Sequence, residues 1–443
     1  MTSPVIQNAL KKVERFPAPL LSMLFGAKPK ITMEKAHTFP ASIMHTFPKI
    51  TASDIAFKHI PKNQPAHIYI QIPWCKIRCL YCRYPSIIKK PNKVEVQKYF
   101  IYLEKELMLY AAKLERTKIF TETIYIGGGT PTILSASELT RLFAIITKYC
   151  AFDSQAFKII ECSPSTITEK KIQAFKNFGI NRVSMGVQSF NRTVLKRIFR
   201  SKDNYSRVKT AIRLLRKYEI PEINFDVMLG LPEQTYEIFL RDIETATRLC
   251  PSSISFLDME VWQGCGLYIL SSKESVDDAF NRWKMQLVMT AMYQDYLESS
   301  NYIPTRPHYY VLPADMRHPS TRVPYLDSRM AGFQIGLGIG ALGHIGTTVY
   351  RNFATPTAYE TALAQNVLPI DKGMRLSAHD AHAMRTIRSL CDETRFPEES
   401  KKQYTKIIHF LTRAHFLDEQ LKLTATGRLF GSEIMYMLYP KIK

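Results

Sequence analysis

The chain has 443 residues, of which 46% are apolar, a composition that excludes a wholly disordered protein and provides for a sizeable core. Its 60 Lys and Arg exceed its 39 Asp and Glu, and the net charge of +21 favours an anionic partner without identifying one. No stretch reaches the roughly 18 consecutive apolar residues that a membrane span needs. No export signal is recognisable, so we expect a cytoplasmic protein whose eight cysteines are reduced and available for metal.

The first 66 residues form a segment of their own. They contain several prolines and no sustained hydrophobic period. We therefore expect residues 1–66 to be an irregular extension that packs on the main domain.

From His67 onward, short apolar strands alternate with longer amphipathic helices. Strands are expected at 68–72, 123–126, 157–161, 182–185, 223–228 and 254–257. Helices are expected at 94–116, 136–149, 168–178, 205–218 and 236–249. The third helix has a capping box of Thr166 with Glu169, and Gly179 follows its end. This alternation predicts a parallel α/β sheet over residues 67–275, as a six-unit partial barrel or an open doubly wound sheet. In both architectures ligands bind at the carboxyl ends of the strands.

The alternation fades after residue 275. We expect an irregular, β-rich extension over 276–375 and a mostly helical domain over 376–443. Residues Gly338 to Gly343 match the pattern G-x-G-x-x-G, but a strand-like stretch follows them where a dinucleotide site would need a helix. We therefore reject dinucleotide binding.

Three cysteines, Cys75, Cys79 and Cys82, follow the first strand with the spacing C-x3-C-x2-C. Three thiolates on one loop can hold three irons of a cubane cluster and leave the fourth iron free for a substrate or cofactor. A zinc site is one alternative, but structural zinc usually takes four ligands as two pairs, and the next cysteine is Cys150. Three ordinary buried thiols are the other alternative. The spacing favours a 4Fe–4S cluster.

Five further blocks narrow the class. They are Ile72–Cys75, Ile126–Thr132, Glu161–Pro164, Asn181–Phe190 and Asp226–Pro232. With an aromatic residue, Tyr81, before the last cysteine, the chain resembles the radical S-adenosylmethionine (SAM) superfamily. Within it, the chain is similar to the oxygen-independent coproporphyrinogen III oxidase family, which also includes heme chaperones, an anaerobic heme-opening methyltransferase, and class C methylases and cyclopropane synthases. The resemblance is strong from about 67 to 270 and weaker beyond.

This resemblance implies a partial (βα)6 TIM-like radical SAM barrel with the cluster on the three cysteines. It also implies one bound SAM, and a second is left open. The SAM contacts that it assigns are Tyr69, Tyr81, Gly127, Gly128, Gly129, Thr130, Glu161, Gln188, Arg200 and Asp226. Some of these assignments have a plainer reading: the glycines could form an ordinary tight turn, Tyr69 could be a half-buried strand aromatic, and Arg200 could be solvated surface in a basic stretch.

The activity implied by the resemblance is cleavage of SAM to a 5′-deoxyadenosyl radical that acts on a tetrapyrrole or another carboxylated small molecule. Methyl transfer, as in heme opening or cyclopropanation, and heme carriage by a chaperone are the alternatives. An electron donor such as flavodoxin or ferredoxin is the expected partner, and we expect a monomer. Nucleic-acid modification rests on charge alone, and no RNA-binding module is recognisable, so this partner is not expected.

Four positions depart from the family pattern. Gln71 replaces a histidine, Arg83 a glycine, Tyr84 a cysteine and, by a loose alignment, Arg329 a glutamine. The cluster and the first SAM tolerate these changes, whereas they argue against a strict decarboxylase. Residues 306–329 are dense in groups suited to propionates or to stacking on a macrocycle, or to an exposed polar loop: Arg306, His308, Tyr309, Tyr310, Arg317, His318, Arg322, Tyr325 and Arg329.

Overall fold

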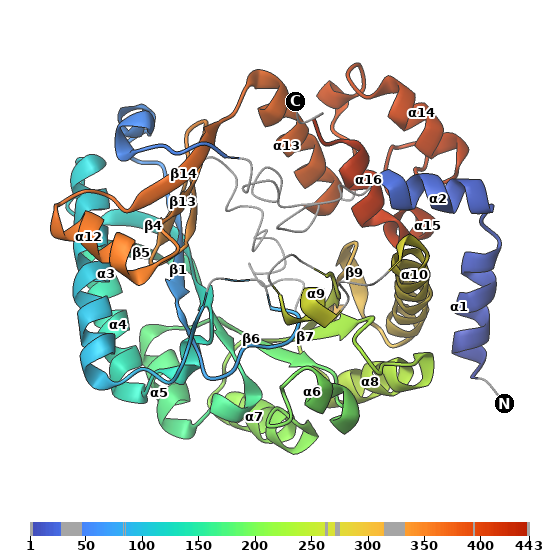
Figure 1. The fold of residues 1–443 in the computed structure, drawn as a ribbon, viewed down its shortest axis with the longest axis horizontal. Helices are drawn as coiled ribbons and strands as arrows, with labels where there is room; N and C mark the ends of the chain where they lie inside the picture. Colours follow the sequence, from blue (N-terminus) through green and yellow to red (C-terminus); the bar gives the residue numbers. More distant parts are fainter. Residues whose placement is uncertain are drawn as a thin grey trace.

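Residues 3–27, 47–82, 84, 86–261, 265–270, 275–313, 333–392 and 395–440 are described by a computed structural model. A 12-stranded sheet organises them, and six parallel strands that neighbour one another in chain order form its middle (Figure 1). These strands are β1 (Ala66–Ile72), β4 (Ile119–Gly128), β5 (Cys150–Cys162), β6 (Arg182–Gln188), β7 (Glu222–Leu229) and β8 (Ser253–Asp258). Each contains a predicted strand, so the expected α/β fold with a parallel sheet is confirmed.

The helices between these strands cover the outer side of the curved sheet (Figure 1). They are α3 (Lys93–Lys113), α4 (Ala136–Tyr149), α5 (Glu169–Phe178), α6 (Arg192–Arg197), α7 (Tyr205–Lys217) and α8 (Tyr236–Leu249). The predicted capping box of α5 is wrong, because Thr168 is the N-cap and the Thr166 hydroxyl donates to the carbonyl of Ser163 instead. Gly179 ends the helix with φ 78°, as predicted.

Further strands extend the sheet at both edges, and most of them are antiparallel to their neighbours. Beyond β1 lie β11 (Phe333–Leu337), β12 (Leu342–Ile345), β13 (Thr348–Asn352) and β14 (Ile370–Arg375), of which β11 is still parallel to β1. Beyond β8 lie β10 (Tyr309–Val311) and β9 (Ile303–Arg306). The G-x-G-x-x-G stretch forms the turn into β12, so a strand follows it as predicted. One sheet therefore crosses the boundary that the sequence suggested at residue 275.

The N-terminal extension is not irregular throughout, which corrects the prediction. It contains two helices, α1 (Pro4–Glu14) and α2 (Ala18–Ala27). Proline suits the first turn of α1, because its missing N–H would have no partner there. Ile6, Ala9 and Val13 are buried on one face of α1, which lies beside α10 (Figure 1).

The part after residue 275 begins with a long helix rather than with β structure, a second correction. This helix is α10 (Val276–Ser299), and buried side chains occupy every position from Gln286 to Gln294. A helix buried all round shows no amphipathic stripe, which explains why the sequence pattern did not reveal it. The later helices are α12 (Pro356–Ala364), α13 (Ala378–Asp392), α14 (Thr405–Arg413), α15 (Ala425–Leu429) and α16 (Gly431–Met437).

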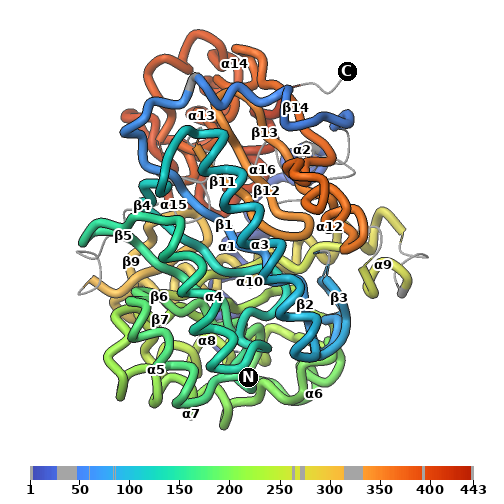
Figure 2. The backbone as a smooth tube through the Cα atoms, turned by 90° about the vertical axis from the view of Figure 1, so that its left-hand side faces the viewer, coloured from blue at the N-terminus to red at the C-terminus, as the bar shows by residue number. Residues whose placement is uncertain are grey.

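The two ends of the molecule are formed by different helices and strands. Figure 2 shows α13, α14 and β14 at one end and α5, α6 and α7 at the other.

No helix within the described ranges is long and apolar enough to cross a membrane.

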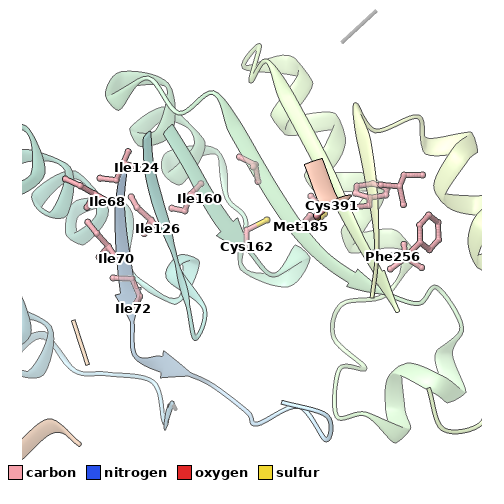
Figure 3. Close-up of a cluster of buried hydrophobic side chains, with 14 of the residues drawn as sticks. Ile68, Ile70, Ile72, Ile124, Ile126, Ile160, Cys162, Met185, Phe256 and Cys391 are labelled. Atoms are coloured by element: carbon pink, nitrogen blue, oxygen red, sulfur yellow. The ribbon is translucent and has the colours of Figure 1, made fainter. Parts of the chain in front are cut away.

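The two faces of the central strands have different roles. Alternate residues such as Ile68, Ile70 and Ile72 of β1 belong to a buried apolar cluster, shown with its neighbours in Figure 3. The residues between them include polar ones: Gln71 of β1 lies next to Gly127 of β4 in the sheet register. Because side chains alternate along a strand, the polar positions share the inner face. That face carries the candidate site.

Candidate functional site

The three cysteines of the motif lie on the loop that follows β1. The loop starts with β2 (Trp74–Cys75), which pairs with β3 (Ile87–Ile88). The thiols of Cys75, Cys79 and Cys82 are partly buried, and none forms a disulfide. The N–H of Cys82 donates to the carbonyl of Cys79 at 3.0 Å, which closes a tight turn. The loop therefore presents three free thiols from one short segment.

This cysteine loop is held between two helices. The N–H of Leu80 donates to the carbonyl of Ile198 at the end of α6, and the carbonyl of Leu80 accepts from the N–H of Leu267 in α9 (Gly266–Leu270) at 3.0 Å. The Leu80 side chain is buried with Val194 and Leu195 of α6. These contacts fix the loop at the carboxyl end of the sheet, where ligands of such folds bind.

The glycine-rich loop after β4 supports the first cysteine. The N–H of Thr130 donates to the carbonyl of Trp74 at 2.8 Å, and the Thr130 hydroxyl lies 3.4 Å from the Cys75 sulfur. A Cβ atom on Gly129 would lie 2.5 Å from the Trp74 carbonyl oxygen, and Gly128 has φ 103°. These glycines are therefore required by contacts within the protein, as in an ordinary tight turn, and their contact with SAM stays a prediction.

Glu161 points from β5 toward this loop. Its carboxylate accepts hydrogen bonds from the Tyr125 hydroxyl and from the N–H of Gly128, the latter at 3.2 Å. The Tyr125 ring stacks on Tyr69 at 5.7 Å between centroids, and the Tyr69 hydroxyl donates to Gln71. Tyr125 therefore links the two predicted residues, because it stacks on Tyr69 and donates a hydrogen bond to Glu161.

Arg200 is not solvated surface. Only 13% of its side chain is exposed, and its guanidinium donates to the carbonyl of Gly186 at 2.7 Å and pairs with Asp203 at 2.9 Å. A third contact reaches the Cys79 sulfur at 3.7 Å. The structure therefore places a positive charge directly behind the cysteine loop, which the basic stretch around Arg200 did not disclose.

Gln188 is the last residue of β6, and Asp226 lies within the neighbouring strand β7. Gln188 has φ 67°, a left-handed conformation that is uncommon for a non-glycine residue and turns the chain out of β6. Asp226 accepts hydrogen bonds from Ser184 at 3.0 Å and from the side-chain amide of Asn224 at 2.8 Å. The structure thus places Gln188 at the end of β6 and Asp226 one strand away, and their contact with SAM stays a prediction.

Several charged side chains of the site act on the pKa of a cysteine outside the motif, Cys162. Burial raises the pKa of this thiol, and the negative charges of Asp203 and Asp226 add to the effect. The positive charge of Arg200 lowers the pKa of Cys162, and the negative charge of Glu161 raises it. These four side chains therefore lie close enough to influence one thiol, although they come from different segments of the chain.

Burial also acts on the motif thiols. It raises the pKa of Cys75, and it raises the pKa of Cys82 to about 11, with nearby Cys79 as the next cause. For Tyr81, burial and the adjacent Cys79 raise the pKa of the phenol. A metal ion that binds such a thiol displaces its proton and coordinates the resulting thiolate. The donor chemistry therefore fits a metal cluster.

The site also contains buried polar atoms that could meet a ligand. Within the described part of the chain, the Oε1 atom of Gln188 and the Nε atom of Arg200 are buried without a hydrogen-bond partner. Such atoms usually have a partner in folded proteins. An acceptor and a donor near the cysteine loop suit a small polar molecule such as SAM.

The zinc alternative requires several side chains to bind one and the same ion. In the residues that the structure describes, no group of three or more His, Cys, Asp or Glu side chains is arranged to hold one ion. A cubane instead distributes its cysteine ligands over different irons.

The dense aromatic and basic segment is described only in part, since Arg317, His318, Arg322, Tyr325 and Arg329 lie outside the described residues, as does Arg83. The described members pack within the protein. His308 lies 2.6 Å from the Tyr293 hydroxyl, and the Tyr309 hydroxyl donates to Ser253 at 3.0 Å. Their proposed contact with propionates stays a prediction.

Two functional neighbours were absent from the sequence prediction, Asp203 and Tyr125. Asp203 pairs with Arg200 and accepts from the Ser163 hydroxyl at 2.6 Å, which ties the loop before α7 to the end of β5. Its burial could not be read from a stretch rich in exposed basic residues. For Tyr125, its position two residues before Gly127, on the same strand face, was the available signal.

The fold and the site together define a radical SAM protein. The family model described as "Radical SAM superfamily" matches residues 69–246. The chain is 30% identical over 288 residues to the heme chaperone HemW of Escherichia coli, covering 64% of this chain and 71% of that protein. It therefore belongs to the HemN/HemW-like coproporphyrinogen III oxidase family of radical SAM proteins.

Other relatives carry two different names. The oxygen-independent coproporphyrinogen III oxidase of Helicobacter pylori J99 is 26% identical over 380 residues, covering 83% of this chain and 80% of that protein. The heme chaperone HemW of Haemophilus influenzae is 33% identical over 252 residues, and the chain spans 64% of its length. The solved coproporphyrinogen III oxidase HemN of Escherichia coli shares the fold, with a TM-score of 0.72, 21% identity, and coverage of 89% of this chain and 97% of that one. Membership of this superfamily implies a 4Fe–4S cluster and SAM.

Proposed function

We propose that this chain holds a 4Fe–4S cluster on Cys75, Cys79 and Cys82 and cleaves SAM in order to modify a carboxylated tetrapyrrole. The observation that carries the proposal is the shared packing of the cysteine loop with Thr130 and Arg200, which come from two other loops at the same edge of the sheet. When bound, the reduced cluster supplies one electron that splits SAM into methionine and a 5′-deoxyadenosyl radical.

The side chains of this site would bind and orient SAM. Three thiolates leave the fourth iron open to the amino and carboxylate groups of SAM, as the family resemblance implies. Glu161 offers a carboxylate to the ammonium or the ribose, and Gln188 offers an acceptor that is buried without a partner in the described residues. Asp226, Tyr69 and the glycine-rich loop complete the proposed contacts.

The substrate class rests on relatives and on charge. Relatives named coproporphyrinogen III oxidase align with most of this chain, and a net charge of +21 suits a substrate with several carboxylates. The proposed reaction is abstraction of a hydrogen atom from the substrate by the 5′-deoxyadenosyl radical, which becomes 5′-deoxyadenosine. The substrate radical then loses carbon dioxide and one electron, and that electron passes to a one-electron acceptor. A one-electron donor such as flavodoxin or ferredoxin would reduce the cluster.

Heme carriage is the second candidate, because several relatives bear the name heme chaperone HemW. It predicts tight heme binding and little turnover of SAM. Methyl transfer would instead release S-adenosylhomocysteine as a product.

One anaerobic experiment separates these functions. The reconstituted protein is incubated with SAM, dithionite and either coproporphyrinogen III or heme, and the products are identified by mass spectrometry. We expect 5′-deoxyadenosine together with a substrate that has lost carbon dioxide. S-adenosylhomocysteine would transfer the proposal to methylation, and stoichiometric heme binding without SAM cleavage would replace it with heme carriage.

Replacing Glu161 with glutamine is expected to weaken SAM binding about 10- to 100-fold, since a hydrogen bond to a charged group contributes roughly 1.5–3 kcal/mol. Equilibrium dialysis of SAM against the cluster-loaded variant measures the loss. Glu122→Gln is the matched control, because the Glu122 side chain is 49% exposed on the same strand as Tyr125. Unchanged SAM affinity with a lowered melting temperature would show that Glu161 only supports Tyr125 and Gly128.

A further inference from the structure

Two segments at the cysteine loop carry only basic charges, although one of these residues, Lys89, pairs with Glu95 outside the segments. Residues 76–90 and 192–202 contain Lys and Arg but neither Asp nor Glu. The exposed basic side chains in these two segments are Lys76, Arg78, Lys89, Lys90, Arg192, Lys196, Arg197 and Lys202. The two segments are adjacent in space, because the N–H of Leu80 donates to the carbonyl of Ile198. Figure 2 shows β2, β3 and α6 at the same edge of the molecule.

Four large apolar side chains of these two segments are exposed, one of them Ile88 of β3 at 42%. Ile77 and Tyr84 of the cysteine loop are 46% and 43% exposed, and Phe199 at the end of α6 is 54% exposed. Exposed apolar residues inside a charged ring are typical of protein interfaces. We name this surface, made of residues 76–78, Tyr84 and residues 196–202 without the buried members Ile198 and Arg200, the basic cluster face.

Phe199 is exposed because of how α6 ends. It has φ 62°, a left-handed conformation that a bulky side chain rarely adopts. The next residue, Arg200, donates its N–H to the carbonyl of Leu195 at 2.7 Å and turns its side chain inward toward Cys79. The turn that places Arg200 behind the cysteine loop therefore also directs Phe199 outward, next to that loop.

We infer that the basic cluster face is the docking surface for an acidic single-electron carrier protein. The inference rests on the proposed function, because it is the cluster on Cys75, Cys79 and Cys82 that the carrier would reduce. The carrier loses one electron and the cluster gains it, with no bond formed or broken. Charge complementarity selects an acidic partner, and the exposed apolar side chains lie on or next to the loop that carries the three partly buried cysteines.

Two variants test the face with flavodoxin, an acidic flavoprotein, as the probe. Lys196→Glu with Arg197→Glu reverses two exposed charges, and we expect flavodoxin binding to weaken at least about tenfold, with a smaller dependence on salt. Phe199→Asn removes the ring while supplying a residue that tolerates a left-handed conformation, so the fold is retained and weaker binding reports the interface. Isothermal titration calorimetry at two salt concentrations measures the affinity without any turnover.

The control reverses two exposed charges on the opposite side of the molecule. Lys402→Glu with Lys406→Glu makes the same change in net charge at α14, which Figures 1 and 2 show far from α6. We expect this variant to bind flavodoxin like the unmodified protein. If both double variants weaken binding equally, the effect is that of net charge, and the assigned face is wrong.

SAM cleavage separates this inference from the proposed function. Dithionite is small and needs no docking surface, so we expect the Lys196→Glu, Arg197→Glu variant to cleave SAM normally with dithionite and slowly with reduced flavodoxin. Normal rates with both reductants would overturn the docking surface and leave the function standing. No cleavage by the unmodified protein with dithionite would overturn the function, while the calorimetry would still decide the docking surface.

Discussion

Replacing Cys79 with alanine is expected to remove the cluster and with it SAM cleavage. The variant leaves two thiols on the loop and removes the sulfur that Arg200 contacts at 3.7 Å. Mutation of groups that merely support a metal ligand costs about 10- to 100-fold in affinity or activity, so loss of a ligand should cost more than about 100-fold. Iron analysis after anaerobic reconstitution and mass spectrometry of 5′-deoxyadenosine measure the two losses.

Cys250→Ala is the matched control for this variant. Cys250 is exposed, is not disulfide-bonded and ends α8, so its removal should leave iron content and SAM cleavage unchanged. Before reconstitution, the melting temperatures of both variants should stay near that of the unmodified protein without its cluster, because neither thiol belongs to the buried core. Full iron content in Cys79→Ala would place the cluster elsewhere and remove the basis of the proposed function.

Glu106 is expected to make the folded protein less stable as pH rises. This carboxyl on α3 is fully buried, and it accepts hydrogen bonds from the N–H of Gly338 at 2.8 Å, the side-chain amide of Asn352 at 2.7 Å and the hydroxyl of Tyr359 at 2.6 Å. It thereby fixes the glycine turn before β12 against the sheet. Burial nevertheless raises the pKa of Glu106 from 4.5 to about 8, because the three donors only partly replace water.

The direction follows from proton uptake. Below pH 4.5 the carboxyl is protonated in both the folded and the unfolded chain. Between 4.5 and about 8 the folded protein keeps the proton that the unfolded chain releases, so the free energy of unfolding falls as pH rises through this window. A pKa difference of this size corresponds to at most about 5 kcal/mol.

Glu106→Gln removes this titration. The variant should be less stable at pH 5, because one donor faces the new amide and loses its acceptor, at a cost of about 1–3 kcal/mol. Its stability should fall less steeply toward pH 8 than that of the unmodified protein, so the two curves converge or cross. Urea unfolding at several pH values measures both slopes, with Glu104→Gln on the same helix as control. Parallel curves for Glu106→Gln and the unmodified protein would contradict the prediction.

The central sheet was predictable because its signals are local. Each parallel strand is a short apolar run between turn residues, and each connecting helix has an apolar stripe, so neither requires knowledge of its partner. The cysteine spacing is likewise contained in eight consecutive residues. The six central parallel strands lie in the sheet in their chain order, because right-handed crossovers place each new strand beside the last.

Features that depend on partners distant in the chain escaped prediction. The helix α10 lacks a stripe because other segments bury its middle, residues 286–294, on every side. The predicted cap residue Thr166 instead lies close to Thr132, a residue on a different loop. Local propensity cannot anticipate such competition, since a hydroxyl bonds to whatever group the fold brings near it.

Arg200 shows most clearly what the amino-acid sequence determined and what the tertiary structure decided. By its sequence it is one of several basic residues after a short helix, suited to solvent. The left-handed turn at Phe199 and the pairing with Asp203 direct it inward to the cysteine loop instead. The amino-acid sequence by itself determined the six parallel strands, the predicted helices between them and the three thiols, because these depend on near neighbours. The tertiary structure alone decided which charges surround the thiols, because burial and pairing join residues far apart in the chain.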